Sequence, residues 1–87
     1  MRFYLFEASC KKPHNRAGVA WALEGLAELF WLSGAPLRAA RVWGAAETLR
    51  AAAGAGMTPD ERMRHDRAVA GACAHANADA FAAAWAA

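Results

Sequence analysis

Apolar side chains recur every three to four residues along most of this 87-residue chain. Over residues 16–32 this spacing is that of an amphipathic helix. Pro13 disfavours helix at the residue before it, so we expect a helix to begin after it with Asn15 as the N-cap. The stripe along this first predicted helix consists of Val19, Leu23, Leu26, Ala27 and Phe30.

A second helix is predicted over residues 36–53. Gly34 suits the left-handed end of the first helix, and Pro36 suits the first turn of the next. So short a turn forces an antiparallel hairpin. We expect Leu26 and Phe30 of the first helix to be buried against Ala39, Trp43 and Ala46 of the second, with Arg38, Arg41 and Arg50 on the opposite, polar face.

The third helix has a clear start signal. Thr58, Pro59 and Glu61 provide a capping hydroxyl, a proline in the first turn and a returning carboxylate. This helix is expected to reach about residue 76, to bury Val69 and Cys73, and to end at Asn77 with a positive φ. A last helical segment, residues 79–87, carries Phe81 and Trp85 on one face. The predicted fold class is all-α, with about four helices in antiparallel hairpins.

Composition supports this fold and excludes several classes of function. The chain has 26 alanines and no isoleucine, which favours helix over strand. The net charge is only +2, and the sequence has no dense basic stripe of the kind that nucleic-acid binders carry. Direct nucleic-acid binding is therefore not expected. No segment approaches the roughly 20 apolar residues of a membrane span. The two cysteines form no disulfide framework or CxxC pair, which is typical of a reduced, cytoplasmic protein.

The first two predicted helices resemble the tetratricopeptide helical hairpin, with Gly34 as its turn glycine. The large consensus positions then fall on Leu23, Leu26, Phe30 and Trp43, and the small ones on Ala27, Ala39 and Ala46. The usual first tryptophan is replaced by Leu23. Ala51 stands where a proline ends the consensus helix, so the second helix should run longer here.

Several separated motifs also resemble the C-terminal helical-repeat tail of bacterial LuxR and MalT-like, adenylate-cyclase-associated ATPase regulators. They are GVAWALEGLA at 18–27, GAAE at 44–47 followed by Leu49 and Arg50, PDER at 59–62 and FAAAW at 81–85. The resemblance covers residues 15–87. It departs at His65, where the family usually has tyrosine, and at Ala76, where it has leucine.

The resemblance implies a scaffold rather than a catalyst. Members of that family carry a phosphate-binding loop and often a DNA-binding helix-turn-helix, but this chain contains no GxxxxGK pattern and its only lysines are Lys11 and Lys12. Neither ATP hydrolysis nor DNA reading therefore carries over. We therefore expect a non-enzymatic tetratricopeptide-like region over residues 16–87, preceded by a non-matching segment over residues 1–15. It would bind a protein or effector, or associate with itself, without a cofactor. The alternative is a small DNA-associated helix-turn-helix regulator.

A second face of the first helix is the candidate binding surface. At about 100° per residue, two tryptophans and two glutamates share an arc away from the predicted core. In tetratricopeptide hairpins this face lines the concave groove, where it would suit a basic or amphipathic peptide. Alternatively, residues 1–12 or a neighbouring repeat cover the tryptophans. The candidate partner-binding residues are Trp21, Glu24, Glu28 and Trp31.

The remaining chemistry-bearing residues give weaker signals. Cys10, His65, Cys73 and His75 lack the spacing of zinc ligands, so the two histidines are expected at the surface. Neither cysteine has a local histidine and orienting group for nucleophilic catalysis. The arginines at 62, 64 and 67 alternate with acids, which is typical of a solvated helix face with internal pairs.

Overall fold

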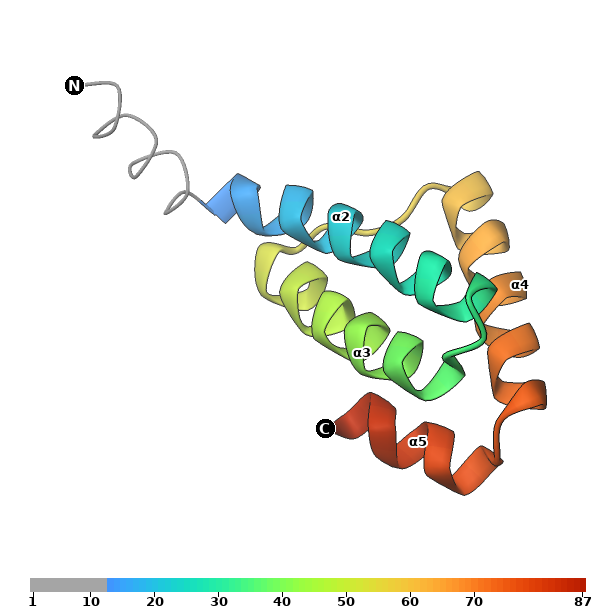
Figure 1. Cartoon of the computed structure of the whole chain (residues 1–87). Coiled ribbons are helices and arrows are strands. Elements are labelled where there is room, and N and C mark those ends of the chain that lie inside the picture. The colour runs from blue at the N-terminus through green and yellow to red at the C-terminus, as the bar shows by residue number, and fades with distance from the viewer. Residues whose placement is uncertain (1–12) are drawn as a thin grey trace.

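The computed structural model describes residues 13–87 and is all-α over that range (Figure 1). The predicted fold class is confirmed, and the described residues contain no strand. None of their helices is long and apolar enough to cross a lipid bilayer. The helices are α2 (Pro13–Leu32), α3 (Pro36–Ala53), α4 (Pro59–His75) and α5 (Ala78–Ala86). The expectations for Cys10 and for the rest of residues 1–12 lie outside the described residues.

The α2–α3 hairpin forms as the turn chemistry predicts. Gly34 adopts a φ of 87°, a backbone conformation that side chains with a Cβ rarely enter. The Ala35 N–H donates to the Phe30 carbonyl at 2.8 Å, which satisfies the end of α2. Pro36 then begins α3, where its missing N–H costs nothing. The two helices consequently pack side by side along most of their length (Figure 1).

Both signals that separate α3 from α4 are also confirmed. Gly54 ends α3 with a φ of 66°, and the Ala55 N–H donates to the Arg50 carbonyl at 3.0 Å. The Thr58 hydroxyl accepts from the Glu61 N–H at 3.2 Å, while the Glu61 carboxylate accepts from the Thr58 N–H at 3.0 Å. This reciprocal pair is the predicted capping box.

The junction between α4 and α5 corrects the prediction for Asn77. This residue has a φ of −69° and caps the start of α5 rather than the end of α4. Its side-chain oxygen accepts from the N–H groups of Asp79 and Ala80 at 2.9 and 3.1 Å. These bonds satisfy two N–H groups in the first turn of α5 that would otherwise lack partners. As a cap at the end of α4, Asn77 would not satisfy them. After this turn α5 lies against α3 (Figure 1).

The core is built from alanines around one large aromatic residue. Trp43 is 1% exposed, and it is the one large side chain of the described residues that is fully buried. The Trp85 and Phe81 rings of α5 lie 6.2 and 6.4 Å from it. Alanines allow the helix backbones to approach closely enough to enclose these rings. The buried hydrophobic side chains are those of Ala20, Ala27, Ala39, Ala40, Trp43, Ala46, Ala72, Phe81 and Ala84.

The structure corrects the predicted facing of α2. Val19 and Leu26 were expected in the core stripe but are 49% and 42% exposed, because α2 turns Ala20 toward α3 together with the predicted Ala27. Phe30 is only partly buried at the edge of this core, as are Val69 and Cys73 of α4. The helix also begins at Pro13, so Asn15 lies inside it and is not its N-cap. Ala39, Trp43 and Ala46 are buried as expected.

Candidate functional site

An open groove lies between α2, the start of α4 and the loop that connects α3 to α4. Its volume is about 230 Å³, and α2 forms one wall. Three of the four predicted binding residues line it, together with a mixed polar and apolar set from the other two segments. The lining residues are Trp21, Ala22, Glu24, Gly25, Glu28, Met57, Glu61, Arg64 and His65.

Trp21 is the exposed aromatic residue of this groove. Its side chain is 65% exposed, although a tryptophan that serves only to stabilise a fold is normally covered. Glu28 lies two helical turns further along the same face of α2. Its carboxylate is 3.9 Å from the Arg64 guanidinium across the groove, and Arg64 itself is 81% exposed. A pair this long and this solvated is weak and can open when a partner binds.

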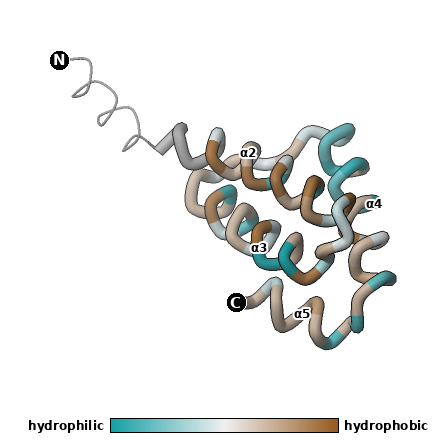
Figure 2. Tube along the Cα trace, viewed as in Figure 1, coloured by the Kyte–Doolittle hydropathy of each residue, from teal (hydrophilic) through white to brown (hydrophobic). Residues whose placement is uncertain are grey.

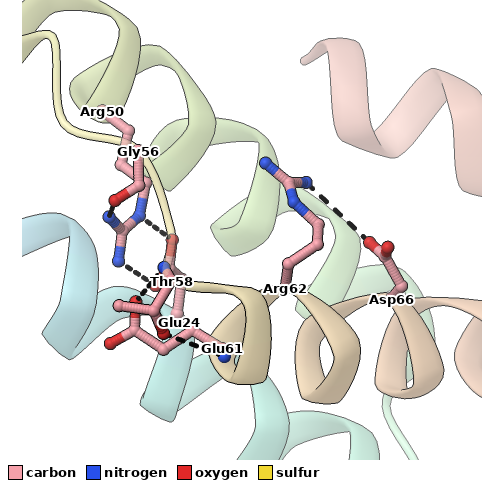
Figure 3. Close-up of polar contacts among 7 residues, drawn as sticks. All are labelled: Glu24, Arg50, Gly56, Thr58, Glu61, Arg62 and Asp66. Atoms are coloured by element: carbon pink, nitrogen blue, oxygen red, sulfur yellow. Dashed lines mark hydrogen bonds and ion pairs between the residues drawn. The ribbon is translucent and has the colours of Figure 1, made fainter.

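Glu24 has a structural partner that the sequence did not reveal. Arg50 donates from Nε to Glu24 Oε2 at 2.6 Å and from Nη2 to Oε1 at 2.8 Å (Figure 3). The hydrogen bond to Glu24 raises the pKa of Arg50 above its ordinary value. Arg50 also donates from Nη1 to the Gly56 carbonyl at 3.3 Å, which ties the connecting loop to α2 and α3. The prediction that Arg50 lies on a polar outer face is therefore wrong.

Trp31 lies outside the groove and joins α2 to α4. A Cβ placed on Gly71 of α4 would come within 3.1 Å of the Trp31 ring. The Trp31 and His75 rings pack edge to face, with their centroids 5.3 Å apart. A second hollow beside it is lined by Glu28, Trp31 and Arg64, among others. The structure thus brings Trp21, Glu24 and Glu28 together and places Trp31 at a neighbouring hollow.

His65 is a further groove residue, and it is not the surface histidine that the sequence suggested. Its ring lies edge-on to Trp43 at 6.0 Å and to Trp85 at 6.3 Å. Burial lowers the pKa of His65 from its ordinary value, although the Glu24 carboxylate acts in the opposite direction. His65 therefore forms an uncharged wall between the groove and the aromatic core. The one sequence signal that could have found it is the resemblance described above, in which tyrosine usually stands at this position.

Carboxylates outnumber guanidinium groups among the residues that line the groove. Arg50 neutralises Glu24. The remaining charged side chains that line the groove are the carboxylates of Glu28 and Glu61 and the guanidinium of Arg64. The lowered pKa of His65 keeps its ring uncharged at neutral pH. The arginines of α4 do not form a basic track, because Arg62 pairs along its own helix with Asp66 at 3.8 Å (Figure 3). Within residues 13–87, no group of three potential ligands could hold a metal ion.

Comparisons with known protein families, curated proteins and solved structures find no match for this chain. The groove geometry and its charges are therefore the basis on which a function is proposed.

Proposed function

We propose that this chain is a non-enzymatic helical-repeat scaffold whose α2–α4 groove binds a basic, amphipathic segment of a partner protein. It would serve as the tail, or a remnant, of a bacterial signal-transducing transcriptional regulator of the LuxR and MalT-like type. The observation that carries the binding proposal is the exposed Trp21 at the edge of a groove bordered by Glu28 and Glu61. An exposed aromatic face beside carboxylates is the environment that attracts a lysine or arginine side chain.

The size of the groove favours a peptide over a small-molecule substrate. Its volume of about 230 Å³ is below the ~300–1,000 Å³ of clefts that enclose small ligands. One or two side chains of a helical or extended segment would fill it, with the rest of the segment lying across α2 and α4. Recognition of this kind uses spaced side-chain contacts on a preformed helical surface.

Calorimetric titration with a designed peptide tests the proposal. The peptide is a 16-residue amphipathic helix with leucines on one face and lysines on the other, and its control carries glutamate in place of every lysine. We expect binding of the lysine peptide that weakens with added salt, and no binding of the glutamate peptide.

Two variants of α2 locate the binding surface. Trp21→Ala is expected to weaken binding by about 5- to 30-fold, since a desolvated cation–π contact contributes about 1 to 2 kcal/mol. Leu32→Ala is the matched control, because Leu32 is another exposed apolar residue of α2 but does not line the groove. Equal affinities of the two variants, or equal binding of both peptides, would refute the proposal.

A further inference from the structure

One apolar seam of α2 has no partner within the described residues. α2 meets α3 through a seam in which Ala20 and Ala27 are fully buried and Leu23 and Phe30 are half-buried. Each residue of this first seam is preceded in the sequence by a residue of a second set, which we call the second seam. It consists of Val19, Ala22, Leu26 and Leu29, all of which are exposed.

The second seam has the spacing of a helix-packing surface. Its members follow one another by three, four and three residues, as the core positions of paired helices do. Val19 is 49%, Leu26 42% and Leu29 61% exposed, and the hydrophobic colouring along α2 is visible in Figure 2. A surface helix ordinarily places charged residues on such a face.

No charge interrupts this side of α2. At about 100° per residue, Glu24 and Glu28 project to the groove side, away from the second seam. Between positions 18 and 33, every residue on the seam side is apolar or small and uncharged. These residues are Gly18, Val19, Ala22, Gly25, Leu26, Leu29, Leu32 and Ser33. A partner surface must be equally free of charge, because a charge buried there would be desolvated without compensation.

We propose that a second copy of this chain covers the second seam, with the two α2 helices antiparallel. The other helices of the described residues do not offer a matching surface. The exposed face of α3 carries Arg38 and Arg41, and α4 is charged around most of its first half. The exposed face of α5, a helix of nine residues, carries Asp79. The second seam itself is the surface that can meet a second seam without burying a charge, and a two-fold axis makes such a contact self-complementary.

The order of large and small residues selects the antiparallel arrangement. With a two-fold axis at the level of residue 24, Val19 lies opposite the partner's Leu29, and Ala22 lies opposite the partner's Leu26. Each large residue therefore meets a smaller one, and Gly25 leaves room beside them. A parallel pair would set alanine against alanine and leucine against leucine at the same levels, which packs unevenly. Val19, Leu26 and Leu29 of the second seam do not line the groove, whereas Ala22 and Gly25 border both surfaces. The interface does not depend on the proposed function.

Sedimentation equilibrium of the full chain across a concentration series tests the interface. Wild-type protein is expected to form dimers in a concentration-dependent manner. Leu26→Glu should raise the dimer dissociation constant roughly 100-fold or more, since it places an unpaired charge in the seam. Met63→Glu is the matched control, because Met63 is an exposed apolar residue of α4, and it should leave dimerisation unchanged. Unaltered helical circular dichroism shows that each variant is folded.

A charge-pair experiment tests the antiparallel arrangement. Val19→Lys and Leu29→Glu should each weaken the dimer, whereas the double variant should recover it, because the two new charges face each other across the two-fold axis. Trp21→Ala should dimerise like wild type, which separates this interface from the groove. The proposal is overturned by a wild-type monomer at every concentration, by a Leu26→Glu dimer as tight as that of Met63→Glu, by a double variant weaker than both single variants, or by loss of the dimer in Trp21→Ala.

Discussion

Arg50 and Glu24 are 26 residues apart in sequence and form two parallel hydrogen bonds of 2.6 and 2.8 Å. Both side chains are only 14% exposed, so this pair is shielded from solvent more than the other ion pairs of the described residues. Because Arg50 also binds the Gly56 carbonyl, one guanidinium fixes α2, α3 and the connecting loop together (Figure 3). Arg50 therefore holds Glu24, one of the residues that line the groove, in place.

Loss of this pair should destabilise the fold measurably. Arg50→Ala is expected to lower the free energy of unfolding by about 1 to 2 kcal/mol, since it leaves the Glu24 carboxylate partly buried and unpaired. Arg50→Lys should recover little of this, because an ammonium group cannot form the two parallel bonds. Arg62→Ala is the control, because its partner Asp66 is 3.8 Å away and both side chains are well exposed. Urea unfolding of the three variants checks the order, and an Arg62→Ala loss as large as that of Arg50→Ala would contradict it.

Gly44 marks the closest approach of α3 to α5. A Cβ at this position would overlap the Trp85 carbonyl oxygen, which belongs to backbone and cannot move aside easily. Gly44→Ala should therefore destabilise the protein by about 1 to 3 kcal/mol, although alanine is the better helix former. Gly18→Ala is the matched control, because Gly18 is also helical but has no neighbouring atom within 4 Å of such a Cβ. It should gain up to about 1 kcal/mol. Thermal unfolding of both variants at equal concentration gives the comparison, and two shifts of the same sign would rule out this contact.

His65 should make stability depend on pH near neutrality. Its folded-state pKa is lowered, so the unfolded chain binds the proton more tightly, and protonation favours unfolding. The contribution of His65 is complete above its unfolded pKa of about 6.5 and is lost as the pH falls through the lower, folded-state value. Urea unfolding at a series of pH values from 7.5 to 5 should show this loss.

Two histidine variants separate this effect from the titration of other groups. His65→Gln should flatten the decline between pH 7.5 and 5, and His75→Gln, which replaces an exposed histidine, is the substitution control. The groups whose charges act on His65 are Glu24, Arg50, Arg62 and Asp66, and these remain in both variants. If the free energy of unfolding changes with pH identically in the His65→Gln and wild-type proteins, the pKa of His65 is not responsible for the pH dependence.

Local sequence signals predicted most of the helix boundaries, although α2 begins at Pro13 and Asn15 is not its N-cap. Gly34, Pro36 and Gly54 each impose or tolerate one backbone conformation, and the Thr58 capping box depends on residues only three apart. These signals need no knowledge of the tertiary structure. The prediction for Asn77 was wrong because this residue stands between two helices, and asparagine suits a cap at the end of one helix or at the start of the next. Only the packing of α5 decides between the two.

Side-chain facing and tertiary pairs were harder to predict. Leu26 was placed in the core because its spacing fits, but α2 carries two adjacent apolar seams, and periodicity does not say which of them meets α3. The Glu24–Arg50 pair and the position of His65 between two tryptophans depend on how separate helices are placed in space. Three of the four candidate binding residues do line one groove, because their arc on α2 follows from helix geometry alone.

The proposed groove function is tested most directly by the indole N–H resonances of the four tryptophans, followed by nuclear magnetic resonance while the lysine peptide is added. Trp21 is exposed at the groove, whereas Trp43 is buried in the core and the Trp85 indole donates to Glu47 at 2.9 Å. We predict that the Trp21 indole signal shifts progressively to saturation while the Trp43 signal stays in place. A peptide that binds without moving the Trp21 signal, or that moves only the signals of the other tryptophans, would contradict the groove as the binding site.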